Sequence, residues 1–281
     1  MQASASKIAI VTGGSAGLGR VMTLALLAAG HRVTAVGRTQ SLLDELVAAA
    51  RSAGTGDRLL PAIGDVASPD DCAAVVARTR ERFGGLDAVV NNAGVNLPTP
   101  VRKDDPKFWK VTPEDWRRLI DTNVNGTFLM SRAAVPHLIE RGWGRIVNHL
   151  TSLRTMIRPG DTPYGPSKAA LEAMTTAWAG ELAGTGVTVN AIMPGGAADT
   201  RMISPEIVPD RSRLVDPAVM GPPICWLIST ASDGFTGYRI TAEHWDPNAS
   251  VEINLAKSAA ETGWKELLTA ATATARTWPP K

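Results

Sequence analysis

Short apolar runs alternate with longer amphipathic stretches along most of this chain. The first run, from Ile8 to Val11, ends at Gly13 and has the length of a strand that is buried on both faces. Apolar residues at helical spacing follow it. The alternation repeats and predicts strands at 7–12, 32–36, 58–64, 88–90, 143–150, 187–193 and 238–241, with later helices at 42–53, 69–83, 114–139, about 162–182 and 217–229.

Strands that alternate with helices predict a parallel sheet with helices on both faces. We therefore expect an α/β fold, a doubly wound parallel sheet of about seven strands, in a single domain over residues 1–281. Two irregular segments, 95–113 and 197–216, are expected to border a pocket, although an ordinary surface loop explains the first equally well. The tail over 246–281 shows one weak helical pattern near 250–261.

A glycine-rich turn directly follows the first predicted strand and leads into a helical pattern. Glycines let a backbone approach a pyrophosphate, and the N-terminus of the next helix faces its negative charge. A turn without a ligand is the alternative. The first reading makes the turn a phosphate cradle with the cofactor-binding residues Gly13, Ser15, Gly17, Leu18 and Gly19.

The second predicted strand leads to Arg38. In NAD-binding folds an acidic residue near this point binds the ribose 2′-hydroxyl. This position carries no carboxylate, and a guanidinium can bind an additional phosphate instead. Arg38 therefore favours NADP(H), unless it is an ordinary exposed loop cation. After the third strand, Asp65 and Val66 are placed either to cap the next helix or to contact an adenine.

The fourth predicted strand runs into Asn91, Asn92, Ala93 and Gly94. Small residues after a strand allow a ligand to lie close to the backbone. The last three of these residues are therefore further candidates for cofactor binding. Within the predicted helix over 114–139, a buried Asn123 would have to find hydrogen-bond partners.

Tyr164 and Lys168 are four residues apart in another predicted helix, which places them on one face. A nearby ammonium favours the phenolate and lowers the pKa of the tyrosine. The pair therefore suits general acid–base catalysis on an alcohol or a ketone, although a surface pair is the alternative. Pro166 fits only if this helix begins near residue 162 or 163, because its missing N–H is tolerated in the first turn.

Several of these candidates follow directly after predicted strands. Ligands in doubly wound sheets bind outside the carboxyl ends of the strands, near the point where the strand order reverses. Because these candidates are all expected at the same edge of the sheet, the acid–base role of Tyr164 is better supported than it is by the Tyr164–Lys168 spacing alone. The residues concerned are Gly13, Asp65, Asn91, Thr151 and Pro194.

Composition narrows the function classes. The formal net charge is +2, from 29 basic and 27 acidic residues, without a basic block, so we expect no nucleic-acid partner. No apolar run is long enough to span a membrane, and the first residues lack the order of a signal peptide. Cys72 and Cys225 have no metal or redox spacing and suggest reduced thiols in a cytoplasmic protein. The four histidines show no paired spacing for a metal ligand set.

Taken together, these motifs make the chain resemble the short-chain dehydrogenase/reductase family over about residues 7–241. The likeness rests on Thr12-Gly13 with Gly17 and Gly19, on Asn91 to Gly94, on Asn123, on Tyr164 with Lys168, and on Pro194-Gly195. It implies a Rossmann fold that binds NAD(P) and hydride transfer between the cofactor and a carbonyl or alcohol carbon. It also implies a homotetramer or a homodimer.

The resemblance implies roles for single residues. Tyr164 would be the acid/base, Lys168 would bind the ribose and lower the pKa of the tyrosine, and Asn123 would hold a water in the proton relay. Pro194 and Gly195 would contact the cofactor. The family's catalytic serine position falls on Thr151, counted either from Tyr164 or from Asn148. The expected substrate lining is mostly apolar and includes His149, Ser152, Leu153, Met202 and Trp245.

The sequence thus predicts an NADP(H)-dependent oxidoreductase that interconverts a hydrophobic ketone and a secondary alcohol, with Tyr164 as the proton donor. One alternative in the same fold uses NAD and oxidises an alcohol. Another is a catalytically idle nucleotide-binding protein that acts as a sensor or scaffold. The intact set of Tyr164, Lys168 and Asn123 argues against the idle protein.

Overall fold

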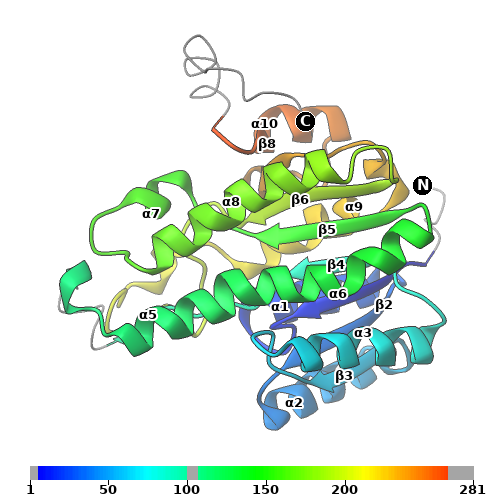
Figure 1. The fold of residues 1–281 in the computed structure, drawn as a ribbon, viewed down its shortest axis with the longest axis horizontal. Coiled ribbons are helices and arrows are strands. Elements are labelled where there is room, and N and C mark those ends of the chain that lie inside the picture. The colour runs from blue at the N-terminus through cyan, green and yellow to red at the C-terminus, as the bar shows by residue number, and fades with distance from the viewer. Residues whose placement is uncertain (1–5, 100–106, 265–281) are drawn as a thin grey trace, which may run out of the picture.

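The computed structural model describes residues 6–99 and 107–264 and contains one eight-stranded sheet (Figure 1). The strand order is β3-β2-β1-β4-β5-β6-β7-β8, and every neighbouring pair is parallel except β7 with β8. The strands are β1 (Ile8–Thr12), β2 (Arg32–Gly37), β3 (Leu59–Ile63), β4 (Ala88–Asn91), β5 (Gly144–His149), β6 (Val187–Met193), β7 (Tyr238–Thr241) and β8 (Ala259–Glu261). The predicted doubly wound α/β fold is confirmed.

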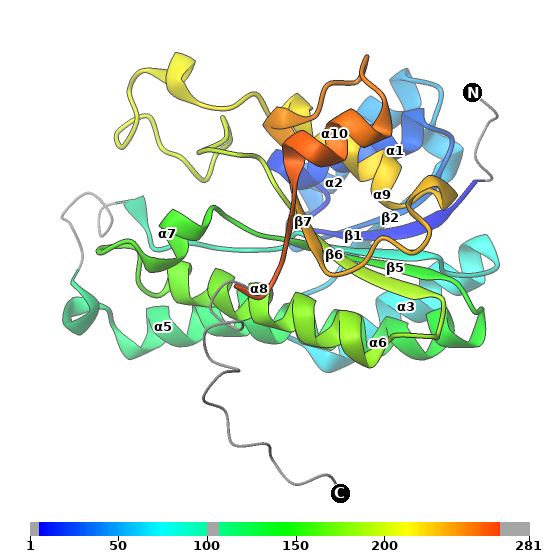
Figure 2. The same cartoon turned by 90° about the horizontal axis from the view of Figure 1, so that it is seen from above.

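Helices cover both faces of the sheet, as Figure 2 shows from its edge. One face carries α1 (Gly17–Ala28), α2 (Gln40–Ser52) and α9 (Gly221–Leu227), and α10 (Val251–Ser258) lies on the same side. The opposite face carries α3 (Pro69–Phe83), α6 (Gly126–Glu140) and α8 (Tyr164–Glu181). Two further helices, α5 (Pro113–Ile120) and α7 (Leu153–Ile157), lie toward the ends of the strands that carry the site.

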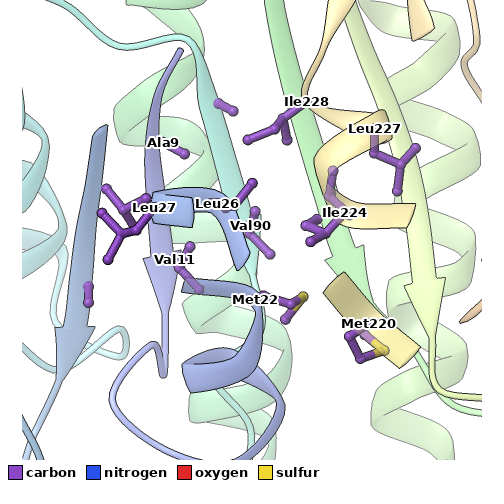
Figure 3. Close-up of a cluster of buried hydrophobic side chains, with 14 of the residues drawn as sticks. Ala9, Val11, Met22, Leu26, Leu27, Val90, Met220, Ile224, Leu227 and Ile228 are labelled. Atoms are coloured by element: carbon purple, nitrogen blue, oxygen red, sulfur yellow. The ribbon is translucent and has the colours of Figure 1, made fainter. Parts of the chain in front are cut away.

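The larger core cluster fills the space between the sheet and α1, α2 and α9 (Figure 3). Met22 and Leu26 of α1 meet Ile224 of α9 above Val11 and Val90, and all five side chains are fully buried. The central strands β1, β4 and β6 are buried over their whole length and mostly apolar, the pattern expected of a parallel sheet that is covered on both faces. This packing fixes the strands whose ends build the site.

Three local features differ from the sequence-based expectations. The helix expected over 114–139 is interrupted by a π-helical turn at Asp121–Asn125, which separates α5 from α6. The five-residue helix α7 was not predicted. The tail adds β8, which pairs antiparallel with β7 and so makes eight strands rather than about seven. A short strand of this kind protects the free edge of β7.

The order of the strands in the sheet determines where the site lies. The connection from β3 to β4 crosses over β1 and β2, so the strand order reverses between β1 and β4. At such a switch point the loops after the two strands run in opposite directions and leave a crevice. Gly13 after β1 and Asn92 after β4 flank this crevice in the described structure.

Candidate active site

A cavity of about 530 Å³ lies at the carboxyl ends of the parallel strands. Most of the expected cofactor-binding residues line it, including those from the glycine-rich turn and from the ends of β2, β3 and β4. The shared lining is Gly13, Ser15, Gly17, Leu18, Arg38, Asp65, Val66, Asn92, Ala93, Gly94, Tyr164 and Lys168.

The glycine-rich turn has the geometry of a phosphate cradle. Gly13 and Gly17 have φ angles of +63° and +51°, a region that favours glycine over residues with a Cβ. A Cβ at Gly19 would collide with the carbonyl oxygen of Gly13, so α1 can approach the turn only with a glycine there. The N-cap of α1, Ala16, provides no side-chain cap, which leaves the first N–H groups of the helix for a ligand. These residues fit a dinucleotide.

Hydrogen bonds lock the ends of β1 and β4 together beside this turn. The hydroxyl of Thr12 accepts from the backbone N–H groups of Asn92 and Ala93, each at 3.0 Å. The side-chain amide of Asn92 donates to the carbonyl oxygen of Thr12 at 2.9 Å. The crevice between the two strands is therefore rigid before any ligand enters.

Arg38 and Asp65 face each other at one end of the cavity. Their closest N–O distance is 3.4 Å, and the two side chains are 57% and 39% exposed. An exposed pair of this kind is worth little, so the guanidinium can turn to a stronger partner. The other carboxylate oxygen of Asp65 accepts from the N–H of Ala67 at 3.0 Å in the turn before α3, but the helix itself is capped by Ser68, so the capping role considered for Asp65 belongs to Ser68.

At the other end, α8 begins at Tyr164, and Pro166 lies in its first turn as expected. Tyr164 and Lys168 both line the cavity, and the ammonium nitrogen lies 5.9 Å from the centroid of the tyrosine ring. The first turn of the helix thus presents both side chains to the same space.

Lys168 is the most unusual cation of the cavity because it is only 2% exposed. Its ammonium donates to the carbonyl oxygen of His149 at 2.7 Å. Burial lowers the pKa of Lys168 to about 8. A buried ammonium with one hydrogen bond from its three donors retains capacity for a ligand such as a ribose hydroxyl.

His149 lines the cavity at the end of β5, close to Lys168. Burial and the positive charge of Lys168 lower the pKa of His149 to about 3, so the ring is neutral at ordinary pH. Its backbone oxygen positions the lysine, and its ring forms part of the wall.

Asn123 lies in the π-helical turn and is fully buried. Its side-chain oxygen accepts from the N–H of Val95 at 2.8 Å, and its side-chain nitrogen donates to Val95 O and to Ser167 Oγ, both at 3.0 Å. The amide therefore ties the loop after β4 to α8. The expected role of Asn123 in holding a water stays a prediction.

The two hydroxyl residues after β5 differ in their surroundings. Ser152 is the N-cap of α7, and its hydroxyl accepts from the N–H of Thr155 at 3.2 Å. Thr151 is partly exposed and lies between the buried Leu150 and this cap. Ser152 is thus engaged in local structure, whereas Thr151 is not part of the cap.

Some expected site residues do not line the cavity. Trp245, expected at the substrate site, packs instead on Trp226 of α9 with ring centroids 5.4 Å apart, because both rings belong to the core on that face. Leu153 packs against a small cluster around Met156. The other expected residues outside the cavity lining are Gly19, Asn123, Thr151, Ser152, Pro194 and Gly195.

Several residues that line the cavity were not named singly from the sequence, although residues 95–99, Thr200 and Arg201 lie in the two segments, 95–113 and 197–216, that were expected to border a pocket. Thr39 follows Arg38, and Thr200 and Arg201 precede the expected Met202. Residues 95–99 also line the cavity, together with Arg118 and Thr122 from the helical segment that runs from α5 to α6. The four-residue spacing of the last two is a helical signal that was available in the sequence.

Two other properties concern the described residues alone. No helix among them is long and apolar enough to cross a bilayer. Their His, Cys, Asp and Glu side chains form no group suited to bind a metal ion.

The sequence of this chain matches a known protein family. The model of a family described as short chain dehydrogenase matches residues 7–208. The 3-oxoacyl-[acyl-carrier-protein] reductase of Thermotoga maritima is 33% identical over 189 residues, which cover 67% of this chain and 73% of the relative. The acetoacetyl-CoA reductase of Shinella zoogloeoides is 32% identical over 246 residues, 84% of this chain and 97% of the relative.

A solved structure agrees with these matches. The gluconate 5-dehydrogenase of Burkholderia cenocepacia, in complex with NADP and tartrate, superposes with a TM-score of 0.74 at 25% identity. The match covers 85% of this chain and 95% of that protein. The structural match thus covers most of the chain, and the family match over residues 7–208 includes the ends of β1 to β6.

Proposed function

Because this chain belongs to the short-chain dehydrogenase family, whose matched relatives are oxidoreductases, we propose that it is an NADP(H)-dependent reductase of ketones. The product is a secondary alcohol. The observation that carries the proposal is the buried Lys168, held by His149 O at 2.7 Å beside the ring of Tyr164 in the cavity at the strand ends.

The cavity suits NADPH along its whole length. Gly13 and Gly17 and the N-terminus of α1 accommodate the pyrophosphate, and Arg38 receives the 2′-phosphate. Lys168 binds the ribose next to the nicotinamide. When bound, the cofactor supplies the hydride that reduces the carbonyl carbon.

The protein supplies the proton and fixes the carbonyl oxygen. Tyr164 donates its phenolic proton to that oxygen, and the Lys168 cation stabilises the phenolate that remains. Thr151 donates a hydrogen bond to the same oxygen from the loop between β5 and α7. The neutral ring of His149 adds no competing positive charge next to the tyrosine.

Ketone reduction is tested by incubating the full chain with a panel of ketones and either NADPH or NADH. The absorbance of the reduced nicotinamide should fall with NADPH and much more slowly with NADH. Preference for NAD⁺ with alcohols would support the dehydrogenase alternative. Tight NADPH binding without turnover of any ketone or alcohol would support the idle nucleotide-binding protein.

A further inference from the structure

The segment 199–202 separates two hollows of the surface. One is the main cavity, and the other is an adjoining hollow lined by residues of the same segment and of 203–205, with Arg211. Both hollows share Gly17, Thr99, Thr200 and Arg201 in their lining. A ligand too long for the main cavity would therefore leave it past Arg201.

Arg211 fixes this segment in place. Its guanidinium donates to the carbonyl oxygen of Ile203, to the carboxylate of Asp199 and to the carbonyl oxygen of Thr200. The bridge between Ala198 and Val215 closes the base of the loop. The ion pair also neutralises Asp199, the one acidic side chain in the lining of the adjoining hollow.

Arg201 differs from the other cations of the main cavity. Arg38 pairs with Asp65, the only carboxylate in the described lining, and Arg118 pairs with Asp115 at 3.2 Å. Lys168 is committed to the acid–base site. In the described part of the chain Arg201 has neither an acidic partner nor a hydrogen bond, so its positive charge is uncompensated at the junction of the two hollows.

The pyrophosphate of the cofactor is one conceivable partner for Arg201, since Thr200 approaches Gly17 closely. The cradle, however, already offers the free N–H groups at the start of α1. Arg201 also lines the adjoining hollow, where Gly17 is the one lining residue from the glycine-rich turn and the others, among them Thr99 and Ile203, belong to neither that turn nor β2. Arg201 therefore lies at the junction that a ligand extending from the main cavity into the adjoining hollow would pass.

We infer that the substrate is a carbonyl compound with an anionic group away from its reacting carbon, and that Arg201 binds this anion. The inference rests on the proposed reductase function and narrows its substrate class. A carboxylate, a sulfonate or a phosphate can each accept paired hydrogen bonds from a guanidinium. Arg201 is thus a specificity-determining residue, with no part in the proton transfer at Tyr164.

Two matched substrate pairs test the inference and distinguish the source of the anion. The short pair is 4-oxopentanoate with its methyl ester. The long pair is acetoacetyl-CoA with the neutral S-acetoacetyl-N-acetylcysteamine. Turnover with NADPH and binding to the enzyme saturated with NADP⁺ are measured for the wild type, Arg201→Ala and the control Arg213→Ala, an exposed arginine of the same loop between β6 and α9.

The wild type should prefer the charged member of at least one pair, and Arg201→Ala should weaken its binding by about tenfold to a hundredfold while the neutral member is unaffected. Arg213→Ala should behave as the wild type. Equal use of charged and neutral ketones, or a preference that survives Arg201→Ala, would overturn the inference but leave the reductase intact. A weaker affinity of Arg201→Ala for NADPH, with both ketones affected alike, would assign Arg201 to the cofactor and also overturn it. Arg201-dependent binding of anions without turnover would retain the anion site and reject the reductase.

Discussion

Two cations at opposite ends of the cavity differ in burial, and this difference suits their expected roles. Lys168 is 2% exposed and keeps a fixed position through His149 O. The Arg38 side chain is 57% exposed, and among the described residues its only partner is Asp65, at 3.4 Å. A buried ammonium can hold a ribose beside a reacting tyrosine, whereas an exposed guanidinium can adjust to a phosphate.

Arg38 should determine the choice between NADPH and NADH. Arg38→Ala removes the partner of the 2′-phosphate, at a cost of about 1.5–3 kcal/mol for a hydrogen bond to a charged group. The KM for NADPH should rise by about tenfold to a hundredfold, while that for NADH changes little. Arg51→Ala, an exposed arginine of α2 outside the cavity, serves as the control. A wild type that favours NADH, or equal weakening of both cofactors, would refute the assignment.

Thr151 and Ser152 should differ sharply under substitution. Thr151→Val keeps the shape and removes the hydroxyl, so kcat should fall strongly, whereas Thr151→Ser should stay active. Ser152→Ala removes the cap of α7, which costs about 0.5–2 kcal/mol of stability, and should leave kcat nearly unchanged. Steady-state kinetics of the three variants decide the matter. If Thr151→Val kept a normal kcat while Ser152→Ala lost activity, the hydroxyl that holds the substrate oxygen would be that of Ser152.

The lowered pKa of Lys168 should make cofactor binding depend on pH. In the free enzyme the lysine is charged below about pH 8 and loses its charge above that value. The affinity for NADPH should therefore be constant between about pH 7 and 7.5 and fall as pH rises through 8. Fluorescence titration from about pH 7 to 10 measures this. Lys168→Met has no ionisable group there and should bind weakly at every pH. A wild-type affinity that stays constant to about pH 9.5 would contradict the assignment.

Among the secondary-structure elements, the helical segment from α5 to α6 has a special position. Its π-helical turn, Asp121–Asn125, inserts Asn123 between the loop after β4 and the start of α8. Turns of this kind are often found at functional sites. Here the turn lets one buried amide tie the loop after β4 to the start of α8.

Asn123→Ala should destabilise the protein and impair catalysis together. The substitution leaves the N–H and C=O of Val95 without their side-chain partner, and the loss should be about 2–6 kcal/mol, since each of the two polar groups left unpaired costs about 1–3 kcal/mol. Urea unfolding measures this loss. Asn125→Ala, which removes only a hydrogen bond to the exposed Asp121, is the control and should be mild. Equal stability of the two variants would show that the buried amide has no such role.

Element boundaries were predictable where apolar periodicity was long. The helix over Pro69–Phe83 and the strand over Val187–Met193 match their expected ranges, because Ser68 with Pro69 at the helix start and a mostly apolar run that opens with Val187, Thr188 and Val189 are strong local signals. The five residues of α7 and the three of β8 are too short to show a period. The π-helical turn keeps the apolar pattern of a helix and depends on contacts with Val95 and Ser167, which are distant in sequence.

For the whole molecule, strand order decides which residues meet. Sequence motifs placed the glycine-rich turn, Arg38, Asn92 and Tyr164 at strand ends or helix starts, and all of these line one cavity. Arg201 and Arg118 reach the same cavity through a loop and a helix face that carry no such motif. Trp245 was assigned from its type and position alone, and its packing on Trp226 could be known only from the fold.

The central claim is that this fold is a working reductase rather than an idle nucleotide-binding protein. Tyr164→Phe tests it most directly, because phenylalanine keeps the ring and removes only the transferable proton. NADPH affinity and kcat are measured on the same preparation of wild type and variant. We predict an affinity within about threefold of wild type, and a kcat lower by about a hundredfold or more, the scale of general acid catalysis. A variant that binds NADPH and turns over ketones at a nearly normal rate would contradict the account.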